Sequence, residues 1–113
     1  YSQEHRYEEG YYDCSSLVQR LYQEVGISLP AIASTQGEFM VTHGLEVTEG
    51  ELEPGDLIFY SYEQNGQFRN ISHVAIYVGN GRMVHAANSR RGVVNDPFNP
   101  SNIGLYGRPS RLQ

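Results

Sequence analysis

The spacing of apolar residues predicts an amphipathic helix near the start of the chain. These residues recur three or four positions apart, as on one face of a helix. They are Cys14, Leu17, Val18, Leu21, Tyr22 and Val25. Asp13 is a favourable N-cap, and Gly26 favours termination. We therefore expect a helix over about 13–25, followed by a shorter one over 33–41.

Apolar runs separated by turn residues predict strands in the second half of the chain. Pro54-Gly55-Asp56 predicts a turn, and Gly79-Asn80-Gly81 predicts the loop of a hairpin. The expected strands are 57–60, 73–78, 82–87 and 92–95. Leu45 and Val47 either pack inward or form a short strand, and 97–109 is expected to be a coil that touches the sheet near Leu105 and Tyr106. Helices followed by an antiparallel meander predict an α+β domain.

Composition and charge narrow the choice of partners. The chain has 113 residues, of which 39% are hydrophobic, so we expect one domain over 1–113. Its formal net charge is −5, which argues against nucleic acid and anionic lipid as partners. No apolar run approaches the roughly 20 residues that cross a bilayer. We therefore expect no nucleic acid partner and no membrane insertion. The single cysteine and the absence of a His-x-x-x-His pair argue against a metal site, so we expect no metal and no cofactor.

The single cysteine, Cys14, allows two interpretations. A helix start offers unpaired N–H groups and a positive dipole end, and both favour a thiolate. The neighbouring Asp13 carboxylate acts in the opposite direction. Cys14 also lies on the apolar face of the helix, so it is equally well placed to be a small core residue. The polar run Asp13-Cys14-Ser15-Ser16 favours a nucleophile at the floor of a cleft.

A thiol nucleophile needs a base, and His73 and His85 are the candidates. A two-residue loop at Asn80-Gly81 would place them on opposite faces of the sheet. A three-residue loop over 79–81 would make Ala75 face His85 and put both histidines on one face. We expect the three-residue loop, with His73 as the base and His85 as the residue that orients its ring. His5 and His43 lie in unpatterned polar stretches and are expected on the surface.

Four short motifs, in order, resemble those of the NlpC-type cysteine peptidases, bacterial enzymes that cut peptidoglycan stem peptides. The nucleophile motif is matched by 13–18, and the entrance to a strand by 52–59. The base-bearing strand and its turn are matched by 71–81. The strand with the third catalytic residue is matched by 84–86.

This resemblance implies a papain-like core, in which an antiparallel sheet packs against the cysteine-bearing helix. It implies Cys14 as nucleophile, His73 as base and His85 as orienting residue. The residues that match its substrate groove are Tyr1, Asp13, Ser15 and Ser72. The implied reaction is hydrolysis between γ-D-glutamate and the diamino acid of a stem peptide.

The same resemblance implies a secreted, extracellular or cell-wall-associated protein. We expect 1–113 to be a monomeric catalytic domain cut from a longer chain with other domains. An amidase or acyltransferase could use the same scaffold, since a fold does not fix a function. A non-catalytic wall-binding module with Cys14 in its core is the alternative from another class.

Overall fold

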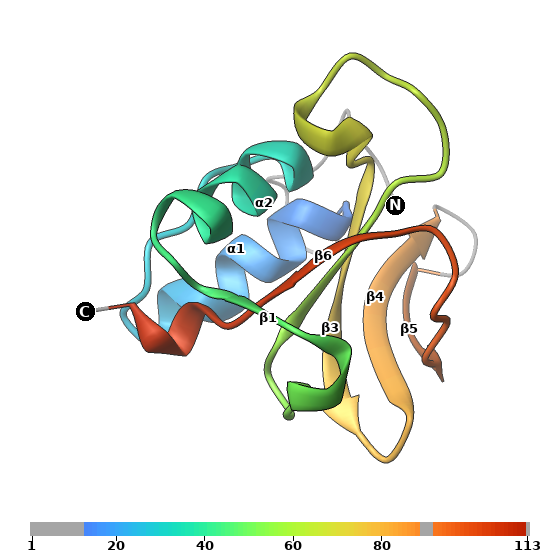
Figure 1. Cartoon of the computed structure of the whole chain (residues 1–113). Helices are drawn as coiled ribbons and strands as arrows, with labels where there is room; N and C mark the ends of the chain where they lie inside the picture. The colour runs from blue at the N-terminus through green and yellow to red at the C-terminus, as the bar shows by residue number, and fades with distance from the viewer. Residues whose placement is uncertain (1–12, 89–91, 113) are drawn as a thin grey trace.

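The computed structural model describes residues 13–88 and 92–112 (Figure 1). Two helices come first: α1 (Cys14–Glu24) and α2 (Ala33–Thr42). The strands are β1 (Glu46–Val47), β2 (Leu57–Tyr60), β3 (His73–Gly79), β4 (Arg82–Asn88), β5 (Gly92–Pro97) and β6 (Ile103–Gly107). Short 3₁₀ turns lie at Glu49–Glu51, Phe68–Asn70 and Pro109–Arg111. Both predicted helices are confirmed to within a residue or two at their ends.

The strands form one antiparallel sheet in the order β1-β6-β2-β3-β4-β5. Helices α1 and α2 lie together on one side of this sheet (Figure 1). The predicted α+β class and the papain-like arrangement of helix and sheet are confirmed. In the part of the chain that the structure describes, no helix has the length and apolar character needed to span a membrane.

The start of α1 is held by a reciprocal cap. The Asp13 carboxylate accepts from the Ser16 main-chain N–H at 2.8 Å, and the Asp13 N–H donates to the Ser16 hydroxyl at 3.0 Å. Such caps contribute about 1 kcal/mol to helix stability. At the other end, Gly26 has a φ of +86°, a conformation that glycine adopts without strain. Asp13 and Gly26 therefore set the two ends of α1 close to the positions that the sequence predicts.

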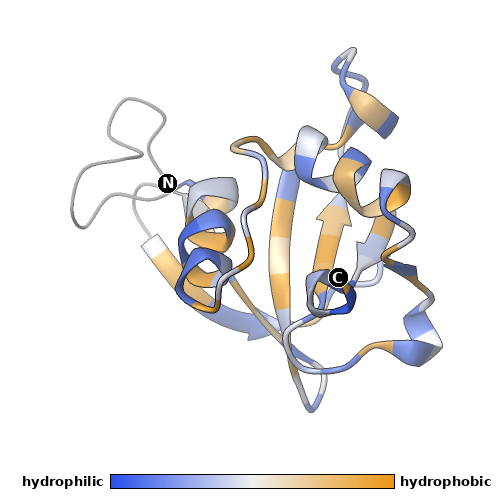
Figure 2. Cartoon of the chain, turned by 90° about the vertical axis from the view of Figure 1, so that its left-hand side faces the viewer, coloured by the Kyte–Doolittle hydropathy of each residue, from blue (hydrophilic) through white to orange (hydrophobic). Residues whose placement is uncertain are grey.

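Strand β2 separates two layers of buried side chains. Leu57 and Phe59 point to the helix side, and Ile58 and Tyr60 point to the opposite face. All four side chains are fully buried. Figure 2 shows hydrophobic residues concentrated along the central strands. The run 57–60 is therefore the shared centre of both layers.

Strand β6 is a correction to the expected coil at 97–109. It lies between β1 and β2, so the chain returns to the middle of the sheet. Gly107 allows this close approach, because a Cβ there would lie 2.4 Å from the Met40 Cγ. The next residue, Arg108, donates from Nε to the buried Asp56 carboxylate at 2.8 Å and fastens β6 to the turn before β2.

Candidate active site

Cys14 occupies the first turn of α1, where the helix packs against β3 and β4. Its side chain is 5% exposed and belongs to the helix-side hydrophobic cluster. The main-chain N–H of Val74 lies close enough to the thiol to lower its pKa in part. Because Val74 follows His73, the thiol lies against the backbone next to that histidine. Cys14 is therefore both part of the core and adjacent to the expected base.

The protonation of this thiol differs from the expected effect of a helix start. Burial raises the pKa of Cys14 to about 11, and the Asp13 charge raises it further, although main-chain N–H groups of Val74 and Ser15 lower it in part. The free-energy cost of desolvating a thiolate at this position thus exceeds the stabilisation that the N–H groups of the helix start give it. The thiol is therefore neutral at neutral pH. Both effects expected from the sequence are present, since N–H groups of the helix start lower the pKa and Asp13 raises it, but burial outweighs them.

The hairpin brings His73 and His85 to one face, but not through the expected loop. Gly79 pairs with Arg82, so the loop has two residues, Asn80 and Gly81. Both have positive φ angles, 53° and 70°, as a type I′ turn requires. A register shift adds one unpaired residue, Val78, between Tyr77 and Gly79. This extra residue puts His73 and His85 on the same face of the hairpin, although a regular two-residue loop would have put them on opposite faces. The three-residue loop was therefore wrong, while the shared face of the histidines is confirmed.

A chain of hydrogen bonds runs across three strands at this face. His73 Nε2 lies 2.8 Å from His85 Nδ1, and His85 Nε2 lies 2.9 Å from Asp96 Oδ2. The two imidazole rings meet edge to face, with centroids 5.0 Å apart. Asp96, on β5, was missed at the sequence level because the strand was expected to end at Asn95. If the predicted strand had been extended by one residue, the alternation of side chains would have placed Asp96 on the same face of the sheet as His85.

The environment of His73 keeps its ring neutral. Burial lowers the pKa of His73 to about 4, and the nearby His85 lowers it as well. At neutral pH the site thus contains a protonated thiol and an unprotonated imidazole. This arrangement suits general-base removal of the thiol proton during attack rather than a preformed ion pair.

The lowered pKa of His73 predicts an acid-dependent loss of stability. An unfolded chain binds a proton on this residue below about pH 6.5, whereas the folded chain does so only below about pH 4. The unfolded state binds more protons in this window, so stability should fall by roughly 3 kcal/mol as the pH drops through it. Urea unfolding of native protein and His73→Gln at several pH values checks this.

The comparison isolates His73 from the carboxylates that titrate in the same range. The His73→Gln protein should lose less stability on acidification than the native protein. His43, whose side chain is exposed, provides the matched control, and His43→Gln should behave like native protein. Identical pH slopes for native protein and His73→Gln would contradict the prediction.

Two tyrosines line the site beside His73 and were not singled out from the sequence. Tyr60 and Tyr62 stack with centroids 5.5 Å apart and an interplanar angle of 6°. The Tyr62 ring centroid is 6.2 Å from that of His73, and its side chain is 52% exposed. Burial raises the pKa of Tyr62, and the Cys14 charge contributes to the same shift. Tyr62 thus forms an exposed aromatic surface beside His73, the expected base.

The other expected site residues divide into buried and exposed groups. Asp13 and Ser15 are buried at the start of α1, where the Ser15 hydroxyl donates to the Asp13 carboxylate at 3.2 Å. Ser72, immediately before His73, is exposed. Tyr1 and His5 lie outside the described residues. The buried Gln36, another residue missed from the sequence, donates to the Ser15 carbonyl at 3.0 Å and supports this turn.

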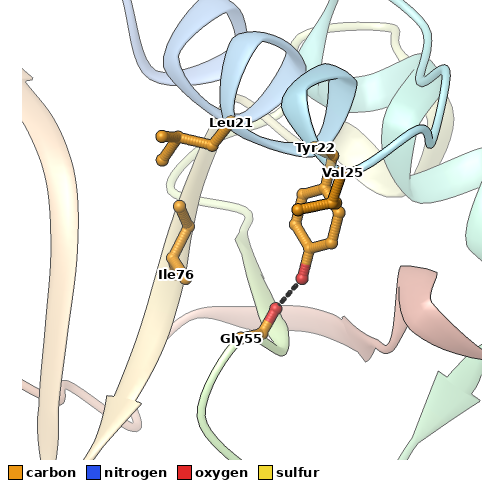
Figure 3. Close-up of a pocket in the computed structure, with 5 residues that line it drawn as sticks. All are labelled: Leu21, Tyr22, Val25, Gly55 and Ile76. Carbon is orange, nitrogen blue, oxygen red and sulfur yellow. Dashed lines mark hydrogen bonds between the residues drawn. The ribbon is translucent and has the colours of Figure 1, made fainter.

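A separate apolar hollow lies at the other end of α1. It has a volume of about 270 Å³ and is lined by Leu21, Tyr22, Val25, Gly55 and Ile76 (Figure 3). The Tyr22 hydroxyl donates to the Gly55 carbonyl and closes one side of it. None of the candidate catalytic residues lines this hollow. Within 13–88 and 92–112, no group of three or more His, Cys, Asp or Glu side chains could hold a metal ion.

A cysteine at the start of a helix, packed against an antiparallel sheet that bears two hydrogen-bonded imidazoles, defines this chain as a papain-like α+β domain. The pattern of the NlpC/P60 family matches residues 3–103, and the chain belongs to this family. The resemblance that the sequence motifs indicated is confirmed.

Named relatives add to this assignment. A γ-D-glutamyl-L-lysine dipeptidyl-peptidase of Bacillus cereus is 33% identical over 101 residues, which are 88% of this chain and 28% of the relative. The bifunctional muramidase/DL-endopeptidase CwlT of Bacillus subtilis is 41% identical over 80 residues, 69% of this chain and 22% of the relative. The chain therefore spans less than a third of the length of these curated relatives.

One solved structure of the same fold belongs to a protein that is described as non-catalytic. RipD of Mycobacterium tuberculosis, described as a non-catalytic NlpC/p60 domain protein adapted to peptidoglycan binding, superposes with a TM-score of 0.69 at 26% identity. The match covers 86% of this chain and 66% of that structure. Membership of the family therefore includes both peptidases and a binding protein.

Proposed function

We propose that this domain is a cysteine peptidase that hydrolyses peptidoglycan stem peptides between γ-D-glutamate and the diamino acid. The observation that supports it most is the hydrogen-bonded pair of His73 and His85, which starts on the strand whose Val74 backbone borders the Cys14 thiol. The named activities of the B. cereus and B. subtilis relatives support the substrate class.

In the proposed reaction the Cys14 sulfur attacks the scissile carbonyl carbon as its proton passes to His73. The main-chain N–H of Cys14, at the helix start, is a donor for the oxyanion that forms. His73 then protonates the leaving amine, and the C–N bond breaks to leave a thioester. His73 next takes a proton from water, which attacks the thioester and releases a carboxylate and the free thiol. His85 holds the His73 ring throughout.

Tyr1, Asp13, Ser15 and Ser72 are the proposed substrate-binding residues. Asp13 and Ser15 lie one residue on either side of the nucleophile, and Ser72 precedes the base, so contacts with substrate would be made next to the reacting atoms. We also propose that the domain acts outside the cell or at the cell wall, as a monomer and as part of a longer protein.

A non-catalytic peptidoglycan-binding module is the second candidate, favoured by the similarity to RipD and by the burial of Cys14. Incubation with purified peptidoglycan separates the candidates. A peptidase should release soluble fragments and expose the amino group of the diamino acid, identified by end-group labelling. An amidase would expose the amino group of alanine, and a binding module would sediment with the wall without exposing either. Either of those outcomes overturns the proposal.

A further inference from the structure

Asp96 is the last residue of the hydrogen-bonded series that begins at His73. In the ladder between β4 and β5, His85 faces Val94 and Met83 faces Asp96. Asp96 therefore lies two residues beyond the partner of His85, at a diagonal position on the same face. The side chains of His85 and Asp96 are 10% and 23% exposed, so their 2.9 Å contact is largely shielded from water.

The Asp96 carboxylate determines which nitrogen donates and which accepts in each of these hydrogen bonds. An ionised carboxylate can only accept hydrogen bonds, so the proton between Asp96 and His85 belongs to His85 Nε2. A neutral His85 then has no proton on Nδ1, and this nitrogen must accept from His73 Nε2–H. His73 is thus protonated on Nε2, and its Nδ1 is left with a lone pair.

We propose that Asp96 is a positioning residue that fixes the tautomers of both imidazoles and leaves His73 Nδ1 free to accept the thiol proton. This inference rests on the proposed peptidase mechanism, in which His73 is the base. Without the carboxylate, His85 can carry its proton on Nδ1 and donate it to His73 Nε2. His73 would then be protonated on Nδ1, and this form cannot take a proton from Cys14.

The native protein tests the proton positions directly. Labelling the histidines with ¹⁵N and recording the long-range ¹H–¹⁵N couplings at neutral pH identifies which ring nitrogen is protonated. His73→Gln and His85→Gln assign the two signals. We expect the Nε2–H tautomer for both rings. A His73 ring protonated on Nδ1 in the native protein would overturn the proposal.

Substitution of Asp96 by asparagine tests what the charge contributes, because the amide has nearly the same shape but can donate as well as accept. We expect Asp96→Asn to lower kcat by ~10³-fold, less than the ~10⁴-fold loss when the orienting aspartate of a catalytic triad becomes asparagine, because Asp96 acts through a second imidazole. KM should stay unchanged, and the Nδ1–H form of His73 should appear. Asp96→Glu, which keeps the charge, should recover part of kcat.

Glu46→Gln is the matched control. It also exchanges a carboxylate for an amide, but Glu46 lies on β1 and pairs with Arg69 at the surface. In Glu46→Gln, the tautomers of His73 and His85 and the value of kcat should equal those of native protein. Unchanged tautomers and kcat in Asp96→Asn would refute the role of Asp96. If the native protein lacks peptidase activity, the proposed function fails, while the tautomer measurement still decides the role of Asp96. If Asp96→Asn fails to fold, the native spectrum and Asp96→Glu decide it.

Discussion

Replacement of Cys14 by serine is expected to lower the rate of stem-peptide cleavage by at least about 10⁴-fold. The thiol supplies the nucleophile of the proposed mechanism, and a hydroxyl at this position is a far weaker one beside an imidazole base. The rate of fragment release from purified peptidoglycan measures the effect. Loss of one residue that forms the covalent intermediate removes most of the catalysis, because the remaining groups act through it.

The fold of Cys14→Ser provides the control for this experiment. Serine is close in size to cysteine, and its hydroxyl can accept a hydrogen bond from the nearby Val74 N–H, which lowers the pKa of the thiol. The circular dichroism spectrum should therefore remain that of native protein. Cleavage by Cys14→Ser at the native rate would show that Cys14 is a core residue and that the nucleophile lies elsewhere.

Replacement of Phe59 by alanine is expected to cause the largest loss of stability, about 3–5 kcal/mol. Phe59 is fully buried in the helix-side cluster, and β2 has neighbours on both sides, so the structure cannot easily close over the cavity. Small domains have only about 5–15 kcal/mol of stability, so this variant should be close to unfolding at 37 °C. Urea unfolding measures the difference.

The position of Phe59 links this loss to the site. Phe59 pairs with Val74, and Tyr60 pairs with His73, so β2 holds the strand that contains the expected base. The activity of Phe59→Ala should fall in proportion to its folded fraction. Val93→Ala, which truncates a side chain that is 50% exposed, should change stability by less than about 0.5 kcal/mol. A loss below 1 kcal/mol in Phe59→Ala would contradict this account of the core.

Local patterns were sufficient to predict α1 and the hairpin. The apolar spacing over 13–25 and the cap at Asp13 are properties of neighbouring residues, and so are the turn residues at 79–81. The register shift at Val78 could not be predicted from neighbouring residues. A register shift depends on the packing of both faces of the hairpin, so the sequence predicted the shared face of the histidines but not the loop that achieves it.

Non-local pairing accounts for the other differences. Strand β6 forms because it fits between β1 and β2, and its own glycine-containing sequence gives only a weak strand pattern. The pKa of Cys14 is raised because β3 covers the first turn of α1, which helix periodicity alone does not reveal. Asp96 was missed because the expected strand ended one residue too early, which removed it from the face of His85.

Cleavage of one defined stem tetrapeptide tests the central proposal most directly. The native protein and Cys14→Ser are incubated with L-alanyl-γ-D-glutamyl-diamino acid-D-alanine, and the products are identified by mass spectrometry. We expect native protein to yield L-alanyl-γ-D-glutamate and the diamino acid-D-alanine dipeptide, and Cys14→Ser to leave the substrate intact. Cleavage at another bond, or the same cleavage by Cys14→Ser, would contradict the proposed peptidase.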